Sequence, residues 1–409
     1  MKILAIIDPH RTDLYYYLKN DKENDYVLLW YENKDQLTGT DFRASGFFKE
    51  EYYWNKFRTP KKLIETIKPD KIVFQQIIDQ RQIGLLVCAY KCGITTFFLD
   101  HGAAGDKETA VIRSTEKDYN FKSRFSHFFS KLNKSLIHVT KVKYYYYSNL
   151  FRLGSLISTL SYLKLPLLML KYQPTKALNI CTFRERVPKY SIVFSRSNFK
   201  EYQLYTGANE SDVIFTGVPS FDHFYRNEIK TGDHVVYIEH PMFEEKLLNW
   251  SSKHHKKIAH FLFDFANSKK VLIYIKLHPR SDIELWRSYH LNSPYFKIIQ
   301  EGDYTELYLS SKLILGYSSS LLTGFICAKK NVVNIGWHPE PRIYGVDFAK
   351  YGLCHQSLNI LDMETKFDSW VSVNLCLNHE TEYQKFILDF NYPFDGKATE
   401  RIIKTIADA

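Results

Sequence analysis

The chain has 409 residues, a length that suits two domains of about 200 residues each. Hydrophobic residues make up 45% and charged residues 24%, which is typical of a globular protein and excludes a disordered one. The formal net charge is +10, and the segment 110–178 carries all of this excess, because twelve Lys or Arg face only two acidic residues there. The six cysteines are scattered, which argues against a zinc site and indicates reduced core thiols.

The N-terminal apolar run, 2–7, is too short for a signal peptide and is interpreted as a first strand. No stretch is long and apolar enough to span a bilayer, because the nearest candidate, 150–170, contains charged residues and a proline. We therefore expect a cytoplasmic protein.

Short apolar runs alternate with helical patterns in the first half of the chain. The buried strands that we predict there are 2–7, 26–31, 71–76 and 94–100. Helical patterns cover 59–69 and 81–93, and Gly93 is a good C-terminal cap. This order predicts a parallel sheet that is covered by helices on both faces.

The pattern lapses in a basic, aromatic segment at about 110–185 and then resumes. The strands that we predict beyond it are 191–195, 212–217, 234–240, 271–278, 296–300, 312–318 and 331–337. A turn-rich seam at 217–233 separates two α/β series. We therefore predict an N-terminal domain at 1–228, a C-terminal domain at 229–395 and a terminal helix at 396–409.

The first candidate site follows the predicted strand 94–100, where Asp100 and His101 precede Gly102. Ligands of open parallel sheets bind beyond the carboxyl ends of the strands, so these side chains could take a proton from an attacking hydroxyl. The alternative is a turn in which the aspartate caps the next helix. Glu239 and His240, at the end of another predicted strand, are the next candidates for this role.

The second candidate site is a basic turn at the end of the predicted strand 271–278. Its residues are Lys276, Leu277, His278, Pro279 and Arg280. The proline stops the strand, and the imidazole and the two cations could bind a phosphate. The alternative is a solvated loop. The dipeptide His-Pro also occurs at 240–241 and 338–339, so its position at the strand end is what favours His278.

The third candidate site is a small, hydroxyl-rich turn at the end of the predicted strand 312–318, after Leu315. Its residues are Gly316, Tyr317, Ser318, Ser319 and Ser320. Serines that open a helix supply capping hydroxyls beside free backbone N–H groups, and the helix dipole adds positive charge, so this turn could bind an anion. Plain capping is the alternative, although one serine would satisfy it. The second and third sites together predict a phosphate cradle without a P-loop, whose sequence pattern is absent.

Three segments, 216–222, 275–282 and 304–333, resemble the C-terminal domain of bacterial GT-B transferases that make surface polymers. The chain is similar to the CDP-glycerol glycerophosphotransferase group and to the bacterial sialyl- and polysialyltransferase group, which carries acidic-acidic-Gly, His-Pro and Ser-Ser motifs. The resemblance covers about 190–340 and the short patch 100–102. It implies two facing Rossmann-like α/β domains with parallel sheets and an active-site cleft between them.

The resemblance implies that His278, followed by Pro279, contacts the donor phosphate and that the serines at 318–320 contact the same phosphate. Asp100 aligns with the second acidic residue of the sialyltransferase motif or with its neighbour, and His101 resembles the histidine of the Trp-His-Gly motif in the glycerophosphotransferases. The sequence Asp-His-Gly matches neither motif, so the identity of the base and the donor class stay open.

The basic segment 110–178 mixes cations with Phe, Tyr and Leu. A nucleic-acid surface would come with a known motif, which is absent, and a plain solvated face is usually mixed in sign. The composition favours peripheral contact with the inner face of the cytoplasmic membrane, where lipid headgroups are anionic. Part of the segment could instead line a groove for an acidic glycan acceptor, and both hold if that acceptor is linked to lipid.

We therefore expect a glycosyltransferase that moves a sialic acid-like, Kdo-like or polyol-phosphate unit from a cytidine-nucleotide donor to a capsule or lipooligosaccharide acceptor. We expect no cofactor and no metal, because helix dipoles and side chains can hold the leaving phosphate. The alternatives are a sugar-nucleotide epimerase of the same fold and a non-catalytic factor for capsule assembly or export. We expect no nucleic-acid partner and leave homodimer formation open.

Overall fold

The computed structural model describes residues 1–7, 15–31, 46–102, 138–172, 174–225, 231–245, 247–278, 280–300, 302–317, 319–343 and 345–409. The chain forms two compact units. Among the described residues, unit 1 comprises 1–102, 138–220 and 397–409, and unit 2 comprises 221–396. Among the described residues, the chain passes from unit 1 to unit 2 after Ser220, inside the turn-rich segment 217–233.

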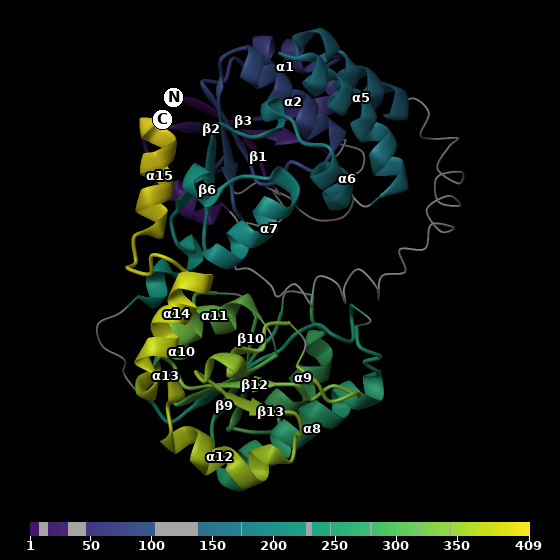
Figure 1. The fold of residues 1–409 in the computed structure, drawn as a ribbon. Helices are drawn as coiled ribbons and strands as arrows, with labels where there is room; N and C mark the ends of the chain where they lie inside the picture. Colours follow the sequence, from purple (N-terminus) through teal and green to yellow (C-terminus); the bar gives the residue numbers. More distant parts are fainter. Residues whose placement is uncertain are drawn as a thin grey trace. The chain divides into compact units, whose positions relative to one another are not determined.

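Unit 1 contains a seven-stranded sheet in which all strand pairs are parallel (Figure 1). Its strands are β1 (Lys2–Ile6), β2 (Asp25–Trp30), β3 (Glu50–Tyr53), β4 (Lys71–Phe74), β5 (Thr95–Leu99), β6 (Tyr190–Val193) and β7 (Val213–Phe215). Their order is β3-β2-β1-β4-β5-β6-β7. Its helices are α1 (Pro60–Ile67), α2 (Gln80–Lys91), α5 (Leu156–Lys171), α6 (Pro174–Ile180), α7 (Arg196–Thr206) and α15 (Ala398–Asp408).

Unit 2 contains a six-stranded sheet, also with parallel pairs throughout. Its strands are β8 (Val235–Ile238), β9 (Ile273–Lys276), β10 (Phe296–Ile299), β11 (Leu313–Gly316), β12 (Val332–Ile335) and β13 (His355–Ser357). Their order is β10-β9-β8-β11-β12-β13. Its helices are α8 (Ser252–Lys269), α9 (Ile283–His290), α10 (Thr305–Ser310), α11 (Ser320–Cys327), α12 (Asp362–Ser372), α13 (Leu375–Asn378) and α14 (Glu380–Phe390).

Each sheet has one point at which the order of its strands reverses. In unit 1 the chain adds β2 and β3 on one side of β1 and then continues with β4 on the other side. In unit 2 it adds β9 and β10 on one side of β8 and continues with β11 on the other. Ligands of open parallel sheets bind at such reversal points, beyond the carboxyl ends of the strands, so β1/β4 and β8/β11 mark the two edges of interest.

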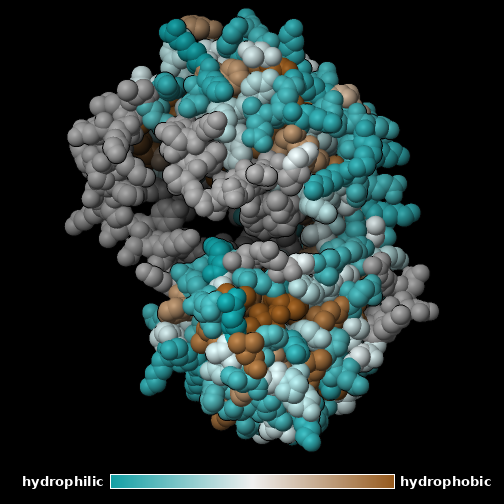
Figure 2. Space-filling view, turned by 180° about the vertical axis from the view of Figure 1, so that it is seen from behind, coloured by the Kyte–Doolittle hydropathy of each residue, from teal (hydrophilic) through white to brown (hydrophobic). Residues whose placement is uncertain are grey.

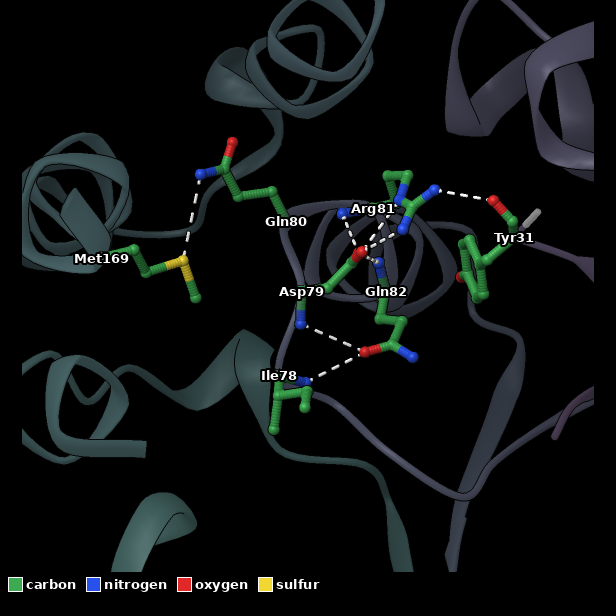
Figure 3. Close-up of polar contacts among 7 residues, drawn as sticks. All are labelled: Tyr31, Ile78, Asp79, Gln80, Arg81, Gln82 and Met169. Atoms are coloured by element: carbon green, nitrogen blue, oxygen red, sulfur yellow. Dashed lines mark hydrogen bonds and ion pairs between the residues drawn. The ribbon is translucent and has the colours of Figure 1, made fainter. Parts of the chain in front are cut away.

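Local sequence explains why α2 begins where it does. The Asp79 side chain accepts hydrogen bonds from the backbone N–H groups of Arg81, at 2.7 Å, and Gln82, at 3.1 Å (Figure 3). The Gln82 side chain in return accepts from the backbone N–H of Asp79 at 3.1 Å. This reciprocal capping box satisfies donors that a helix start otherwise leaves unpaired, and it fixes the chain just past the carboxyl end of β4.

Two buried clusters form the cores. In unit 1, side chains of β1, β2, β4 and α2 pack with Tyr146, Tyr162 and Leu178, which lie in the segment where the sequence pattern lapses. The described part of that segment therefore contributes helices and core side chains. The core of unit 2 is built on β8, β9 and β11 with α8 and Trp286. The surface in Figure 2 is mostly hydrophilic, with a compact hydrophobic area on unit 2.

No helix among the described residues is both long enough and apolar enough to cross a membrane.

Candidate active site

The candidate phosphate-binding residues of unit 2 follow three neighbouring strands. The register places Lys276 of β9 opposite Ile238 of β8, and Ile238 opposite Gly316 of β11. The three strands therefore end level with one another, and the residues after them share one edge of the sheet. This edge includes the β8/β11 reversal point, where a ligand of an open parallel sheet is expected.

Two of the histidines meet at this edge. The rings of His240, after β8, and His278, after β9, are stacked with their centroids 6.3 Å apart. The His278 Nδ1 accepts the backbone N–H of Arg280 at 3.1 Å, so the proton of the neutral ring lies on Nε2. Its carbonyl accepts the Ser281 backbone N–H at 2.9 Å. The imidazole of His278 is thus fixed by the turn that follows it.

The two cations of the predicted basic turn are engaged elsewhere. The Lys276 ammonium donates to the carbonyls of Leu277, at 2.9 Å, and Gln300, at 2.5 Å. The Arg280 guanidinium pairs with the Glu245 carboxylate at 2.5 Å. Both groups stabilise the loops, so the sequence-based expectation that they bind phosphate has no support from their contacts. Pro279 lies outside the described residues.

The turn between β11 and α11 is close-packed and capped. A Cβ on Gly316 would lie 2.9 Å from the Leu322 side chain, so only glycine lets the helix approach the strand this closely. The Ser319 hydroxyl accepts the Leu321 backbone N–H at 3.3 Å as the N-cap of α11, and Ser320 is exposed. Ser318 lies outside the described residues. Ser319 therefore performs the capping role, and Ser320 is presented to solvent at the helix start.

Glu239, the first residue after β8, stabilises this edge of the sheet. It is buried, and burial raises its pKa to about 8, so it is mostly protonated at neutral pH. It accepts a hydrogen bond from the hydroxyl of Ser281, which ties the end of β8 to the turn after His278. Its position indicates a structural role in holding the His278 turn, whereas the sequence marked it as a reserve base.

One group of potential metal ligands occurs among the described residues. Glu239, Glu244 and His255 place ligand atoms within 4.8 Å of one another. Burial lowers the pKa of His255, which keeps the imidazole neutral, but the Glu239 carboxyl is also neutral and already bound to Ser281. A divalent cation prefers ionised carboxylates, so these three residues form a weak cation site.

A cavity of about 370 Å³ adds to the same edge of unit 2. Its lining residues are His223, Asp303, Tyr304, Thr305, Glu306 and Leu307. Asp303 and Tyr304 come from the connection between β10 and α10, and the next three residues form the first turn of α10. Sequence reasoning missed these residues, although a run of acidic and hydroxyl side chains directly after a predicted strand was the available signal.

The candidate base lies in unit 1, at the end of β5 and next to β6. The Asp100 carboxylate accepts backbone N–H groups of His101, at 2.8 Å, and Phe194, at 3.2 Å. These hydrogen bonds favour the charged form, but burial is the larger effect and raises the pKa to about 7. A carboxyl group with this pKa can accept a proton at neutral pH, as a general base must.

The loop after Asp100 is held by residues that the sequence did not single out. Gly102 has φ +72°, a conformation that favours glycine, and its carbonyl accepts the Asn198 amide at 3.2 Å. The Ser195 hydroxyl in turn donates to the Asn198 carbonyl oxygen at 2.6 Å. Ser195 is the N-cap of α7 and Asn198 lies in the first turn of this helix, so the start of α7 positions the candidate base. Their signal was a Ser-x-x-Asn capping pattern after a strand.

Two α/β units, each with a parallel sheet covered by helices, define the GT-B fold. Solved structures of the wall teichoic acid polymerase TagF have this fold in common with the chain, at TM-scores of 0.52 and 0.50 and 12% identity. The alignments cover 100% of this chain and 88% of each polymerase chain, the second being a variant soaked with CDPG. A UDP-GlcNAc 2-epimerase from Methanocaldococcus jannaschii aligns over the whole of both chains at TM-score 0.49 and 12% identity.

The family follows from the sequence itself. The model of the alpha-2,8-polysialyltransferase family matches residues 16–301, which is more than half of the chain. The chain therefore belongs to the alpha-2,8-polysialyltransferase family and is a glycosyltransferase of surface glycan synthesis. No curated protein matches the chain.

Proposed function

We propose that the chain transfers a sialic acid-like sugar from a cytidine-nucleotide donor to a hydroxyl of a growing surface glycan. The observation that carries the proposal is the arrangement at the reversal point of unit 2. There, His278 and His240 are stacked, and α11 begins after the neighbouring strand with its N-terminus capped by Ser319. Imidazole N–H groups and a helix N-terminus are suited to a phosphate that gains charge as it leaves.

The acceptor half of the reaction is assigned to unit 1. Asp100, with a pKa raised by burial to about 7, would take the proton from the attacking hydroxyl. His101 is the alternative base from the same strand end. Separate Asp100→Asn and His101→Ala variants distinguish the two assignments, because only the variant that lacks the base should lose turnover.

The reaction as proposed needs no metal ion. The leaving phosphate would be held by His278, by the N-terminus of α11 and by Ser320, all from the edge of the unit 2 sheet. We also propose that the protein works on the inner face of the cytoplasmic membrane, since the segment 110–178 carries the whole excess of positive charge.

The donor assignment is tested by thermal shift and by turnover. CMP should raise the melting temperature more than UDP or GDP, because a ligand that binds the native state stabilises it. His278→Ala should lower transfer from CMP-sialic acid by about 10²-fold or more, since it removes a contact to the developing charge. His260→Ala is the matched control, because His260 is exposed on α8.

Two results would contradict the proposal. One is a His278→Ala protein that folds and transfers sugar as fast as the wild type. The other is stabilisation by UDP alone, together with conversion of a UDP-sugar in the absence of an acceptor, which would indicate an epimerase.

A further inference from the structure

The helix α5 is anchored in unit 1 by one of its faces. Tyr162 stacks on Tyr146 with ring centroids 3.8 Å apart, and its hydroxyl donates to the Tyr146 carbonyl at 2.7 Å. The Ser158 hydroxyl donates to the buried carboxylate of Glu185 at 2.9 Å. Leu165 is fully buried beside them. These contacts fix the rotation of the helix about its axis, so its opposite face has a defined direction.

That opposite face is a stripe of exposed leucines, here called the leucine ridge. Its members are Leu156, Leu160, Leu163, Leu167 and Leu170. They recur every three or four residues and therefore lie along one side of the helix. Their exposed fractions run from 39% at Leu163 to 74% at Leu156. Contiguous exposed apolar surface on this scale usually marks an interaction site.

The charges around the leucine ridge indicate which partner it meets. Lys164 and Lys171 are exposed on α5, displaced to one side of the ridge, and Lys176 is exposed just beyond it. No acidic residue occurs in the sequence between Asp118 and Glu185. If two copies of α5 paired symmetrically, unneutralised lysines would approach one another, whereas stable helix pairs flank their apolar seam with opposite charges.

An anionic lipid surface satisfies both features at once. Leucines enter the boundary between headgroups and acyl chains, and flanking lysines bind the phosphates. The helix has 16 residues and is about 24 Å long, which is too short to span a bilayer but sufficient to lie along its surface. Its anchored inner face also keeps it parallel to the surface of unit 1.

We infer that the leucine ridge of α5, with Lys164 and Lys171, is the surface by which the protein docks on an anionic membrane. The inference deepens the membrane part of the proposed function and rests on it. It also moves the docking surface away from Lys143, whose ammonium donates to the Gln80 side chain at 3.0 Å and is half-buried.

The position of α5 connects docking to the chemistry within unit 1. Near its C-terminal end, the Met169 sulfur contacts the Gln80 amide at 3.9 Å (Figure 3). Gln80 is the first residue of α2, which starts just past the carboxyl end of β4. The C-terminal end of α5 therefore lies beside the start of α2, just past the carboxyl end of β4, and β5, which leads to Asp100, pairs with β4. A lipid-linked acceptor would reach this edge from the docked surface.

The test is co-sedimentation with vesicles of phosphatidylcholine alone and of phosphatidylcholine mixed with phosphatidylglycerol, at low and high salt. The wild type should bind the anionic vesicles and bind less at high salt, because salt screens the lysines. A triple variant, Leu160→Ser with Leu163→Ser and Leu167→Ser, should bind the anionic vesicles with an affinity lower by about tenfold or more. Lys164→Glu with Lys171→Glu should weaken binding to anionic vesicles as well.

The matched control changes three exposed leucines of unit 2 to serine. They are Leu291, Leu361 and Leu377, with exposed fractions from 53% to 75%. The control should bind vesicles as the wild type does. Transfer to a soluble oligosaccharide acceptor should be unchanged in every variant, so loss of that activity would concern the proposed reaction and not the docking surface.

The inference is overturned if the wild type binds no vesicle, or if the leucine triple variant binds as well as the wild type. It is also overturned if the wild type ignores lipids but forms a dimer that the leucine triple variant loses, because the ridge would then bind a second copy of the chain.

Discussion

Asp100 illustrates how the residue environment sets the chemistry. Two backbone N–H groups favour its ionised form, while complete burial disfavours it, and the pKa rises to about 7 because burial dominates. The folded protein therefore binds this proton more tightly than the unfolded chain does, whose carboxyl has a pKa of 3.8. Stability from this group is fully present below that lower pKa and is lost as pH rises through 7.

Asp100→Asn should make this visible in two measurements. Transfer by the wild type should rise with pH through about 7, as the carboxylate forms, and the variant should lose turnover by about 10²-fold or more while still binding CMP. The unfolding free energy of the variant should decline less than that of the wild type between pH 4 and 7. An unchanged pH–rate profile with normal turnover would assign the base to another group, with His101→Ala as the next variant to measure.

The histidines show where residue-level reasoning succeeded and where it stopped. The sequence selected His278 from its place at a strand end and regarded the other His-Pro pairs as reasons for caution. In the structure, the histidines of the three His-Pro pairs follow strands β8, β9 and β12 of one parallel sheet. The repeated dipeptide therefore marks equivalent strand ends of the fold. Strand order, which a single sequence does not contain, is what brings His240 and His278 together.

At the scale of the element, α11 is positioned by glycines on both of its sides. A Cβ on Gly324 would lie 2.7 Å from the ring of Phe224 and 3.0 Å from that of Phe221, both in the segment Pro219–Phe224. This segment overlaps 216–222, one of the three segments that resemble the C-terminal domain of GT-B transferases. The close approach lets it pack on α11, the helix whose N-terminus is proposed to face the donor phosphate.

Gly324→Ala should therefore lower the unfolding free energy by about 1–3 kcal/mol, because a well-packed site resists an added methyl group. Gly84→Ala is the comparison, since a Cβ on this residue of α2 would meet neighbours only at 3.4 Å or more. Alanine also favours a helix over glycine by about 1 kcal/mol, so Gly84→Ala should be neutral or stabilising. Urea denaturation measures the unfolding free energy of both variants. Equal changes in the two would show that α11 can shift to accommodate the added methyl group without loss of stability.

The elements themselves were predictable where periodicity was strong. The buried strands β1, β8 and β11 and the helices α1 and α2 occur at their predicted places, and each of these strands is one to three residues shorter in total than predicted. The sequence missed β3, an edge strand that begins with two exposed glutamates, and β13, whose three residues are His, Gln and Ser. It also missed α5, because a helix that is apolar on its buried and its exposed sides has no helical period to detect.

At the scale of the whole molecule, the chain returns to unit 1 after completing unit 2. The terminal helix α15 belongs to unit 1, where the Lys71 ammonium of β4 donates to the carbonyls of Ile406, at 2.6 Å, and Ala407, at 2.8 Å (Figure 1). A buried cation at the carbonyl end of a helix is favourable for the helix dipole. The Arg401 guanidinium donates to the Thr216 carbonyl, just beyond β7. The last residues of the sequence thus complete the first unit.

Ile406→Ala should destabilise unit 1 by about 2–5 kcal/mol, because the side chain is fully buried and its removal leaves a cavity. Hydrogen exchange should speed up in β1 and β4 and stay unchanged in β8 and β9. Lys404→Ala, at an exposed position of the same helix, should change neither. Faster exchange confined to unit 2 would mean that α15 does not support the sheet to which its hydrogen bonds connect it.

This return of the chain has a consequence for biosynthesis. Nascent domains generally fold as units from the N-terminus, yet unit 1 lacks its partner for Lys71 until the codons for α15 have been translated. The described part of unit 2 lies between Phe221 and Gly396 and is therefore synthesised before α15. The later half of the gene product would therefore reach its native form before the earlier half. A ribosome that stalls or terminates within the codons for 397–409 would release a chain in which Lys71 of β4 lacks the carbonyls of α15, and such an incomplete unit 1 would be a target for quality-control proteases.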